Sequence, residues 1–243
     1  MPEKFSASRA GRLMICPGSA NLPLSIPGWT PPVVDEEAGA KGKGHRLHEM
    51  LAGISAYPAK DILNLAACLN YMADIRSTRR FKVAIEETRK AMWLESQPET
   101  TVDLVLFVQD EIHIFDWKTG KIPVYADMNS QLMYYGVTWA DVAPKATGIN
   151  FHIVQPWAAD PSTGFNGISH WFCDTDTLLE FQEKAIEAEK KILNNSTQLQ
   201  VSDHCMFCPA FPHSRSDKGR PLCPAAMKHL YPLAVDENEI LND

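Results

Sequence analysis

The chain has 243 residues, of which 45% are hydrophobic and 22% are charged, a composition typical of a globular protein with a packed core. No apolar run approaches the roughly 18 residues that a membrane-spanning helix needs, and the first residues lack the apolar core of a signal peptide. We therefore expect a cytoplasmic protein without membrane association. The formal net charge of −7 argues against a surface that is basic throughout, but it is compatible with a local basic groove beside an acidic metal site.

The pattern of apolar residues along the chain predicts alternating helices and strands. Residues 1–40 are rich in Pro, Gly and Ser and are expected to be mostly loop. The expected helices and strands are a short helix over 8–15, helices after Gly44 and Asp61, a strand over 81–94, a β-hairpin, a helix over 128–139, strands over 147–155 and 168–173, and a helix over 175–194. This order predicts an α/β fold in which a central mixed β-sheet is flanked by helices on both sides.

The expected hairpin comes from two runs of alternating apolar residues, 102–108 and 112–118, on either side of a short polar break. A two-residue turn would consist of either Gln109-Asp110 or Asp110-Glu111. The two choices give two registers, in which Asp103 lies opposite either Asp116 or Lys118.

In both registers Asp103, Asp116 and Lys118 share one face of the sheet, because side chains alternate and cross-strand partners point the same way. Two neighbouring carboxylates repel each other, and a divalent cation between them would remove that cost. The lysine would then be placed to contact a water molecule bound to the metal. The pattern therefore suggests a metal-dependent phosphodiesterase centre.

The string Asp116-Trp117-Lys118-Thr119-Gly120, preceded by Asp103, resembles the PD-(D/E)XK nuclease superfamily, in particular its RecB-like branch. The resemblance implies a restriction-endonuclease-like core in which Asp103 and Asp116 bind Mg²⁺ or Mn²⁺. The backbone carbonyl of Trp117 would complete the metal shell, and Lys118 would orient or help to deprotonate the attacking water.

Two further segments match motifs of the same branch. Gln131 and Tyr135 are four residues apart on one face of the expected helix, and in RecB-type nucleases such a pair contacts the substrate backbone and steadies the lysine. Upstream, His48 follows Gly44 at the spacing of the first motif of the branch, which implies that His48 is a metal ligand through its neutral imidazole.

The cysteines are unevenly distributed: Cys205, Cys208 and Cys223 lie near the end of the chain. The Cys-x-x-Cys spacing of the first two allows both thiolates to reach one metal, and a redox pair is disfavoured because no thioredoxin-like context surrounds them. A zinc site would need a fourth ligand, for which the candidates are His204, His213 and Cys16. The remaining two, Cys68 and Cys173, are expected to be core thiols.

A subset of RecB-like nucleases, including the AddB nuclease domain and the CRISPR-adaptation exonuclease, holds an iron–sulfur cluster with one cysteine before the nuclease core and three after it. Four cysteines occur here in that order: Cys16, Cys205, Cys208 and Cys223. Their order implies a [4Fe–4S] cluster, with Zn²⁺ as the alternative. We therefore expect one nuclease domain over residues 1–243, with its core at about 40–195. Segments 1–40 and 196–230 would form the cluster staple, and 231–243 a flexible tail.

The resemblance also extends to stand-alone phage and bacterial members of the group. It predicts a metal-dependent deoxyribonuclease, acting as an exonuclease in DNA processing or recombination, with DNA as the partner. Basic residues that could line the path of the DNA backbone are Arg76, Arg79, Arg80, Lys118 and Lys121. The alternative is a catalytically silent DNA-binding or assembly module that keeps the iron–sulfur or zinc site.

Overall fold

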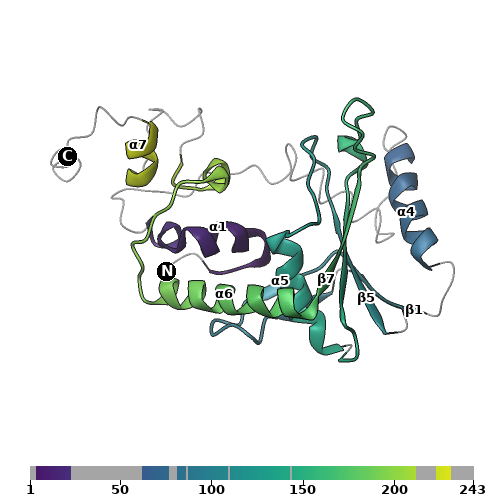
Figure 1. Ribbon diagram of the computed structural model, residues 1–243, viewed down its shortest axis with the longest axis horizontal. Helices are drawn as coiled ribbons and strands as arrows, with labels where there is room; N and C mark the ends of the chain where they lie inside the picture. The colour runs from purple at the N-terminus through teal and green to yellow at the C-terminus, as the bar shows by residue number, and fades with distance from the viewer. Residues whose placement is uncertain are drawn as a thin grey trace. The chain divides into compact units, whose positions relative to one another are not determined.

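The computed structural model describes residues 4–22, 62–76, 81–85, 87–108, 110–142, 144–211 and 223–230 (Figure 1). The chain divides into two compact units. The first combines Met1–Val33, Leu94–Pro98 and Glu183–Asp243, and the second combines Val34–Trp93 and Glu99–Gln182. The predicted nuclease core coincides largely with the second unit, and the predicted staple segments lie largely in the first.

A five-stranded sheet forms the centre of the second unit, in the order β1-β4-β5-β6-β7. Its strands are β1 (Phe81–Ile85), β4 (Leu104–Val108), β5 (Glu111–Trp117), β6 (Gly148–Val154) and β7 (Ile168–Asp174). Strands β5 and β6 are parallel and the other neighbours are antiparallel. The predicted mixed sheet of an α/β fold is therefore confirmed.

Helices cover both faces of this sheet (Figure 1). Helix α4 (Ile62–Arg76) packs Leu65 and Cys68 onto apolar side chains of β4 and β5. Helix α5 (Ser130–Trp139) connects the parallel strands β5 and β6 and covers the opposite face, as a crossover between parallel strands must. The α5 face is the one that carries Asp116, whereas the neighbouring residues Phe115 and Trp117 pack in the cluster under α4.

The register of the β4/β5 hairpin decides between the two predicted arrangements. Val108 pairs with Glu111 and Leu104 pairs with Phe115. Continued by one residue, this register places Asp103 opposite Asp116, which is the first of the two alternatives.

Two segments differ from the sequence prediction. The expected strand over 81–94 is wrong as a single element, because β1 ends at Ile85 and β2 (Thr88–Lys90) pairs with β3 (Glu99–Thr101) in a separate two-stranded sheet. The sequence Thr-Arg-Lys of β2 offers no apolar face to the main sheet. The helix expected from residue 128 begins at Ser130, because Asn129 caps it by accepting the N–H groups of Gln131 and Leu132.

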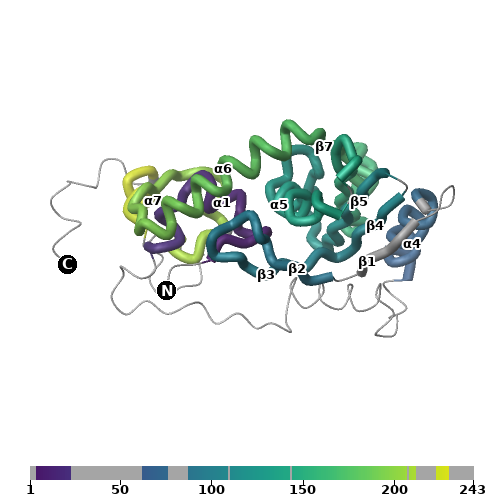
Figure 2. The backbone as a smooth tube through the Cα atoms, turned by 90° about the horizontal axis from the view of Figure 1, so that it is seen from below, coloured from purple at the N-terminus to yellow at the C-terminus, as the bar shows by residue number. Residues whose placement is uncertain are grey.

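The first unit brings together segments that are distant in the chain. It contains η1 (Ala7–Arg9), α1 (Ala10–Ile15), η2 (Pro17–Ala20), the end of α6 (Thr175–Leu193), η6 (Asp203–Phe207) and α7 (Pro224–Leu230). Figure 2 shows the purple α1 and the yellow α7 within this unit. The buried Glu189 carboxylate ties α6 to the segment 94–98 by accepting the N–H groups of Glu95, at 2.7 Å, and Ser96, at 3.2 Å.

Short 3-10 turns complete the described elements: η4 (Ala140–Val142) after α5 and η5 (Pro156–Ala158) after β6. Among the described residues, no helix has both the length and the apolar character that crossing a membrane requires.

A chain of polar rings lies on the α4 face of the sheet. The Tyr71 hydroxyl is 2.9 Å from His152 Nδ1, and His152 Nε2 is 3.0 Å from His113 Nδ1. His113 Nε2 in turn lies 3.3 Å from a Glu111 carboxylate oxygen, and the His170 ring stacks on His152. Burial, and then the neighbouring charges that His113 and His170 would carry, hold the pKa of His152 well below its usual value.

Packing at Gly136 of α5 gives a testable prediction. A Cβ added there would lie 2.7 Å from Phe151 Cζ and 3.0 Å from Leu178 Cδ1, both on buried side chains. A Gly→Ala change inside a helix normally stabilises by roughly 0.5–1 kcal/mol. We expect Gly136→Ala instead to lower the free energy of unfolding by about 1–3 kcal/mol, because the core is overpacked. Urea denaturation measures this, and a raised midpoint would contradict the packing.

The low pKa of His152 predicts an acid-sensitive fold. The unfolded chain takes up a proton at His152 near pH 6.5 whereas the folded chain does not, so stability should fall on acidification by about 1.4 kcal/mol per pH unit below that point. We expect urea midpoints to show a weaker pH dependence for His152→Gln than for the native protein. The half-buried His170, changed to Asn, is the control and should preserve most of the slope. Equal slopes for native protein and His152→Gln would refute the assignment.

Candidate active site

Two carboxylates face α5 where β4 begins and β5 ends. Asp116 is 3% exposed and Asp103 is 8% exposed. The backbone N–H of Trp117 donates to Asp103 Oδ2 at 2.8 Å. This bond orients Asp103 toward the end of β5, so the two carboxylates are held side by side by the strand pairing rather than by flexible loops.

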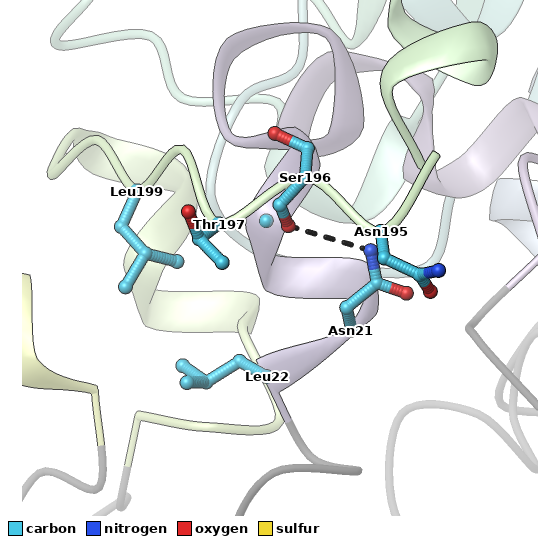
Figure 3. Close-up of a pocket in the computed structure, with 7 residues that line it drawn as sticks. Asn21, Leu22, Asn195, Ser196, Thr197 and Leu199 are labelled. Carbon is cyan, nitrogen blue, oxygen red and sulfur yellow. Dashed lines mark hydrogen bonds between the residues drawn. The ribbon is translucent and has the colours of Figure 1, made fainter. Parts of the chain in front are cut away.

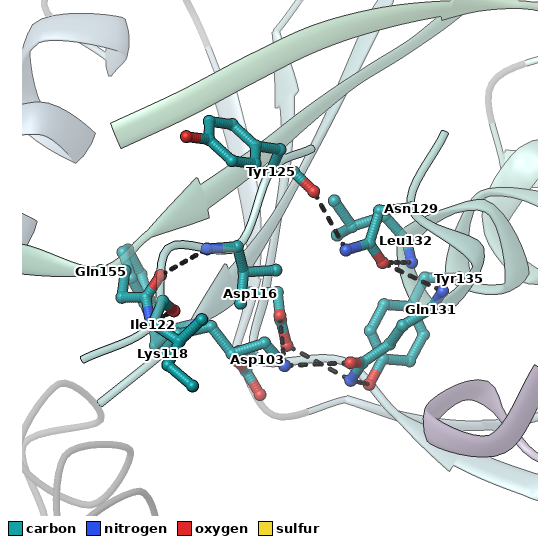
Figure 4. A network of polar contacts seen from close by, with 12 residues as sticks. Asp103, Asp116, Lys118, Ile122, Tyr125, Asn129, Gln131, Leu132, Tyr135 and Gln155 are labelled. Atoms are coloured by element: carbon teal, nitrogen blue, oxygen red, sulfur yellow. Dashed lines mark hydrogen bonds and ion pairs between the residues drawn. The ribbon is translucent and has the colours of Figure 1, made fainter. Parts of the chain in front are cut away.

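Lys118 and Gln131 join the carboxylates in one polar network (Figure 4). Lys118 Nζ lies 2.7 Å from Asp116 Oδ2 and donates to Gln131 Oε1 at 2.9 Å. Gln131 Nε2 donates to Asp116 Oδ1 at 3.3 Å. The amide of Gln131 therefore bridges the Asp116 carboxylate and the Lys118 ammonium. Its orientation is fixed because its oxygen accepts from the lysine and its nitrogen donates to the aspartate.

Tyr135 completes the network one helical turn further on. Its hydroxyl accepts from Gln131 Nε2 at 2.9 Å. Burial, and then the charge of Asp116, raise the pKa of Tyr135 above its usual value, with a smaller contribution from Asp103. The hydroxyl therefore stays protonated and lies within electrostatic reach of both carboxylates. The structure thus brings together five of the residues singled out from the sequence: Asp103, Asp116, Lys118, Gln131 and Tyr135.

One oxygen of this network is paired by charge alone. Asp116 Oδ2 is buried and lies 2.7 Å from Lys118 Nζ, and it accepts no hydrogen bond of good geometry from the described part of the chain. A buried carboxylate oxygen in this position can share its charge with a second cation. Oxygen ligands of this kind suit Mg²⁺ or Mn²⁺.

Within the described ranges, no third His, Cys, Asp or Glu side chain joins the two carboxylates as a ligand for such an ion. Across residues 4–22, 62–76, 81–85, 87–108, 110–142, 144–211 and 223–230, no group of three or more His, Cys, Asp or Glu side chains could hold a metal ion. His48, the predicted third ligand, lies outside these ranges.

A residue that the sequence pattern did not single out organises the loop between Lys118 and Gln131. Gln155, 1% exposed, follows β6 and accepts the N–H of Val124 at 2.9 Å. Its Nε2 donates to the carbonyls of Gly120 and Ile122, both at 2.9 Å. The only available signal was a polar residue that ends the apolar run of β6.

The four cysteines of the predicted staple all belong to the first unit: Cys16, Cys205, Cys208 and Cys223. Two of the sulfurs accept backbone hydrogen bonds, from Gln200 N–H to Cys16 at 3.3 Å and from Ser202 N–H to Cys205 at 3.4 Å. At Cys208 and Cys223 burial raises the pKa of the thiol, and backbone hydrogen bonds from the residues just after them offset only part of that rise. Backbone donors directed at sulfur act in favour of the thiolate, but at these two residues burial outweighs them.

Neighbouring charges also act on the pKa values of these cysteines. Burial raises the pKa of Cys208 and of Cys223, and the charge on Cys16 raises both further. The guanidinium of Arg12, a buried side chain that the sequence pattern did not single out, acts in the opposite direction on Cys208. Segments from both ends of the chain thus bring these thiols and one cation into the first unit, but within the described residues no three of the thiols stand as a ready metal-binding group.

The other two cysteines behave as the sequence predicted. Cys68 in α4 and Cys173 in β7 are buried, and burial raises the pKa of each thiol to about 12. Both therefore stay protonated and serve as core side chains.

A cavity of about 310 Å³ lies in the first unit (Figure 3). The Asn21 amide beside it donates to the Ser196 carbonyl at 3.4 Å, and Leu22 and Leu199 also pack against the cluster that contains Cys208 and Cys223. None of the carboxylate-site residues lines this cavity. Its lining residues are Gly18, Asn21, Leu22, Asn195, Ser196, Thr197 and Leu199.

The fold and the site define an α/β protein with a buried carboxylate–lysine–amide network on one face of a mixed sheet. The chain belongs to the family described as protein of unknown function (DUF2800), whose model matches residues 65–241. No curated protein matches the chain. A similar solved structure, titled "Crystal structure of SSO0001", is 10% identical with a TM-score of 0.37, over 82% of this chain and 81% of that one.

Proposed function

We propose that the protein is a metal-dependent DNA nuclease, and specifically an exonuclease of DNA processing or recombination. The observation that carries the proposal is the buried carboxylate of Asp116, which lies opposite Asp103 and whose Oδ2 pairs with Lys118 without accepting a hydrogen bond from the described residues. Two carboxylates can hold a divalent cation for phosphodiester hydrolysis, and an adjacent lysine can orient the attacking water.

The donor set fits a divalent cation. Asp103 and Asp116 would hold Mg²⁺ or Mn²⁺ with the carbonyl of Trp117, and His48 is the proposed further ligand. The cation, when bound, would stabilise the negative charge that develops on the phosphate oxygens. An ion there would give Asp116 Oδ2 a second cationic partner beside Lys118.

The side chains around the carboxylates have separate tasks in this proposal. Lys118 Nζ, as an ammonium, orients the attacking water in front of the phosphorus atom, and its positive charge helps that water to lose a proton to solvent. Gln131 Oε1 holds this ammonium in place through the 2.9 Å bond, and Tyr135 holds Gln131 from the other side. Because Tyr135 stays protonated, it keeps its position without adding a negative charge next to the phosphate.

Replacing the lysine tests the catalytic proposal. We expect Lys118→Ala to lower Mg²⁺- or Mn²⁺-dependent degradation of end-labelled DNA by at least roughly 100-fold, the usual loss for a group that handles a proton or developing charge. Lys145→Ala, an exposed lysine before β6, is the matched control and should keep the native rate. Single- and double-stranded substrates with 5′ or 3′ labels would show the mode of digestion.

Equal release of product by the native protein and Lys118→Ala, or no release by either, would overturn the proposal. A native protein that binds DNA without cleaving it would instead be the non-catalytic DNA-binding or assembly module.

We further propose that the four cysteines Cys16, Cys205, Cys208 and Cys223 hold a [4Fe–4S] cluster, with Zn²⁺ as the alternative. Backbone donors to the sulfurs and the Arg12 cation would help to stabilise thiolates, the form that both metals require. Burial raises the pKa of Cys208 and Cys223, so the metal would have to displace their protons as it binds. Such a group would cross-link segments from both ends of the chain, so its binding free energy would add to folding.

Anaerobic purification tests the cofactor. We expect the native protein to be brown and to contain iron and acid-labile sulfide, and Cys208→Ser to lose most of both because one of four ligands is missing. Cys173→Ala, which removes a core thiol, should retain the iron. A colourless preparation that contains zinc and no iron would contradict the iron–sulfur cluster and support the zinc site.

A further inference from the structure

The loop over residues 119–130 exposes large apolar side chains beside a polar site. Ile122 is 76% exposed, Tyr125 is 59% exposed and Met128 is 61% exposed. We call these three residues the apolar loop surface. Single exposed apolar residues need no explanation, but three large ones within seven residues of one loop make it a candidate interaction site.

The loop is anchored at both ends in the carboxylate network. Lys118 precedes it and Gln131 follows it, and these two side chains are joined by the 2.9 Å bond from Nζ to Oε1. The two ends of the loop that carries the apolar loop surface therefore lie at the site.

The loop is held in its exposed conformation by hydrogen bonds. Gln155 binds the backbone of Gly120, Ile122 and Val124. Further along, Ser169 Oγ accepts the Ala126 N–H at 2.9 Å, and Asn129 Nδ2 donates to the Tyr125 carbonyl at 3.1 Å. The apolar side chains are thus presented to solvent by a fixed backbone, which lowers the ordering cost of binding.

The Tyr125 ring is itself positioned by packing. It meets Phe165 edge to face, with centroids 5.5 Å apart and planes at 65°. Figure 4 shows the ring directed away from the network of Asp116 and Gln131. A held ring that remains largely exposed is suited to stacking on another flat group.

We infer that the apolar loop surface binds the unpaired bases of single-stranded DNA next to the site of cleavage. Base faces stack on aromatic side chains irrespective of sequence, whereas the bases of an intact duplex are already stacked on each other and unavailable. Lys121, exposed on the same loop, is placed to contact the phosphate backbone. One acidic residue, Asp127, lies on the loop as well. The choice of DNA rests on the proposed function.

Binding measured without cleavage tests this inference. Fluorescence anisotropy of a labelled oligothymidylate of about 15 nucleotides, in EDTA, would be compared with that of a duplex of equal length. We expect Tyr125→Ser to weaken single-strand binding by about fivefold or more and Tyr125→Trp to restore it, since stacking on one aromatic side chain contributes that much. Duplex binding should change by less than about twofold, because duplex contacts are mainly with the backbone.

Phe172→Ser is the matched control. Phe172 is 47% exposed and lies in β7 on the α4 face, the face of the neighbouring His170, which stacks on His152. This variant should bind single strands as the native protein does. Absence of single-strand binding by the native protein, or equal affinities for Tyr125→Ser and Phe172→Ser, would overturn the inference.

The outcomes separate this inference from the nuclease proposal. Selective loss of single-strand binding in Tyr125→Ser would support the inference even if the native protein cleaved no DNA. Metal-dependent cleavage together with unchanged single-strand binding by Tyr125→Ser would leave the nuclease standing and remove the inference.

Discussion

The buried carboxylate of Asp116 is the contact on which the rest of the candidate site depends. One of its oxygens faces Lys118 at 2.7 Å, and the other accepts from Gln131 at 3.3 Å. In an interior of low dielectric constant such charged contacts are strong but need complete partners. Gln131 supplies the link to Tyr135, so the position of α5 over the sheet and the position of the lysine are coupled through one side chain.

The sequence alone predicted which side chains share a face of a strand or a helix, because this depends only on their spacing along the chain. The alternation around Asp103 and Asp116 placed both on one face, and the four-residue step from Gln131 to Tyr135 placed both on one side of α5. Local pattern could not predict what depends on packing elsewhere in the chain. The break between β1 and β2 follows from the lack of an apolar face in β2, and the role of Gln155 depends on a loop more than 30 residues away in sequence.

The cysteines also show what sequence spacing can and cannot predict. Their order and the Cys-x-x-Cys spacing indicated a shared ligand set, but spacing alone does not separate iron–sulfur from zinc. What the structure adds is the environment of the sulfurs: backbone donors at Cys16 and Cys205 and the Arg12 charge near Cys208. Burial raises the pKa of Cys208 and Cys223 as well as those of the core thiols. What marks Cys208 and Cys223 as candidate ligands is that the charge of Cys16 acts on both of them.

The hairpin register has a consequence for how this family can change over time. A residue inserted between Val108 and Glu111 only lengthens the connection, and the pairs from Leu104 to Phe115 survive. The same insertion within either strand would turn one carboxylate from the α5 face to the α4 face, where apolar side chains pack. Homologues should therefore vary in length at the tip of this hairpin, while the arms that carry Asp103 and Asp116 keep a constant length.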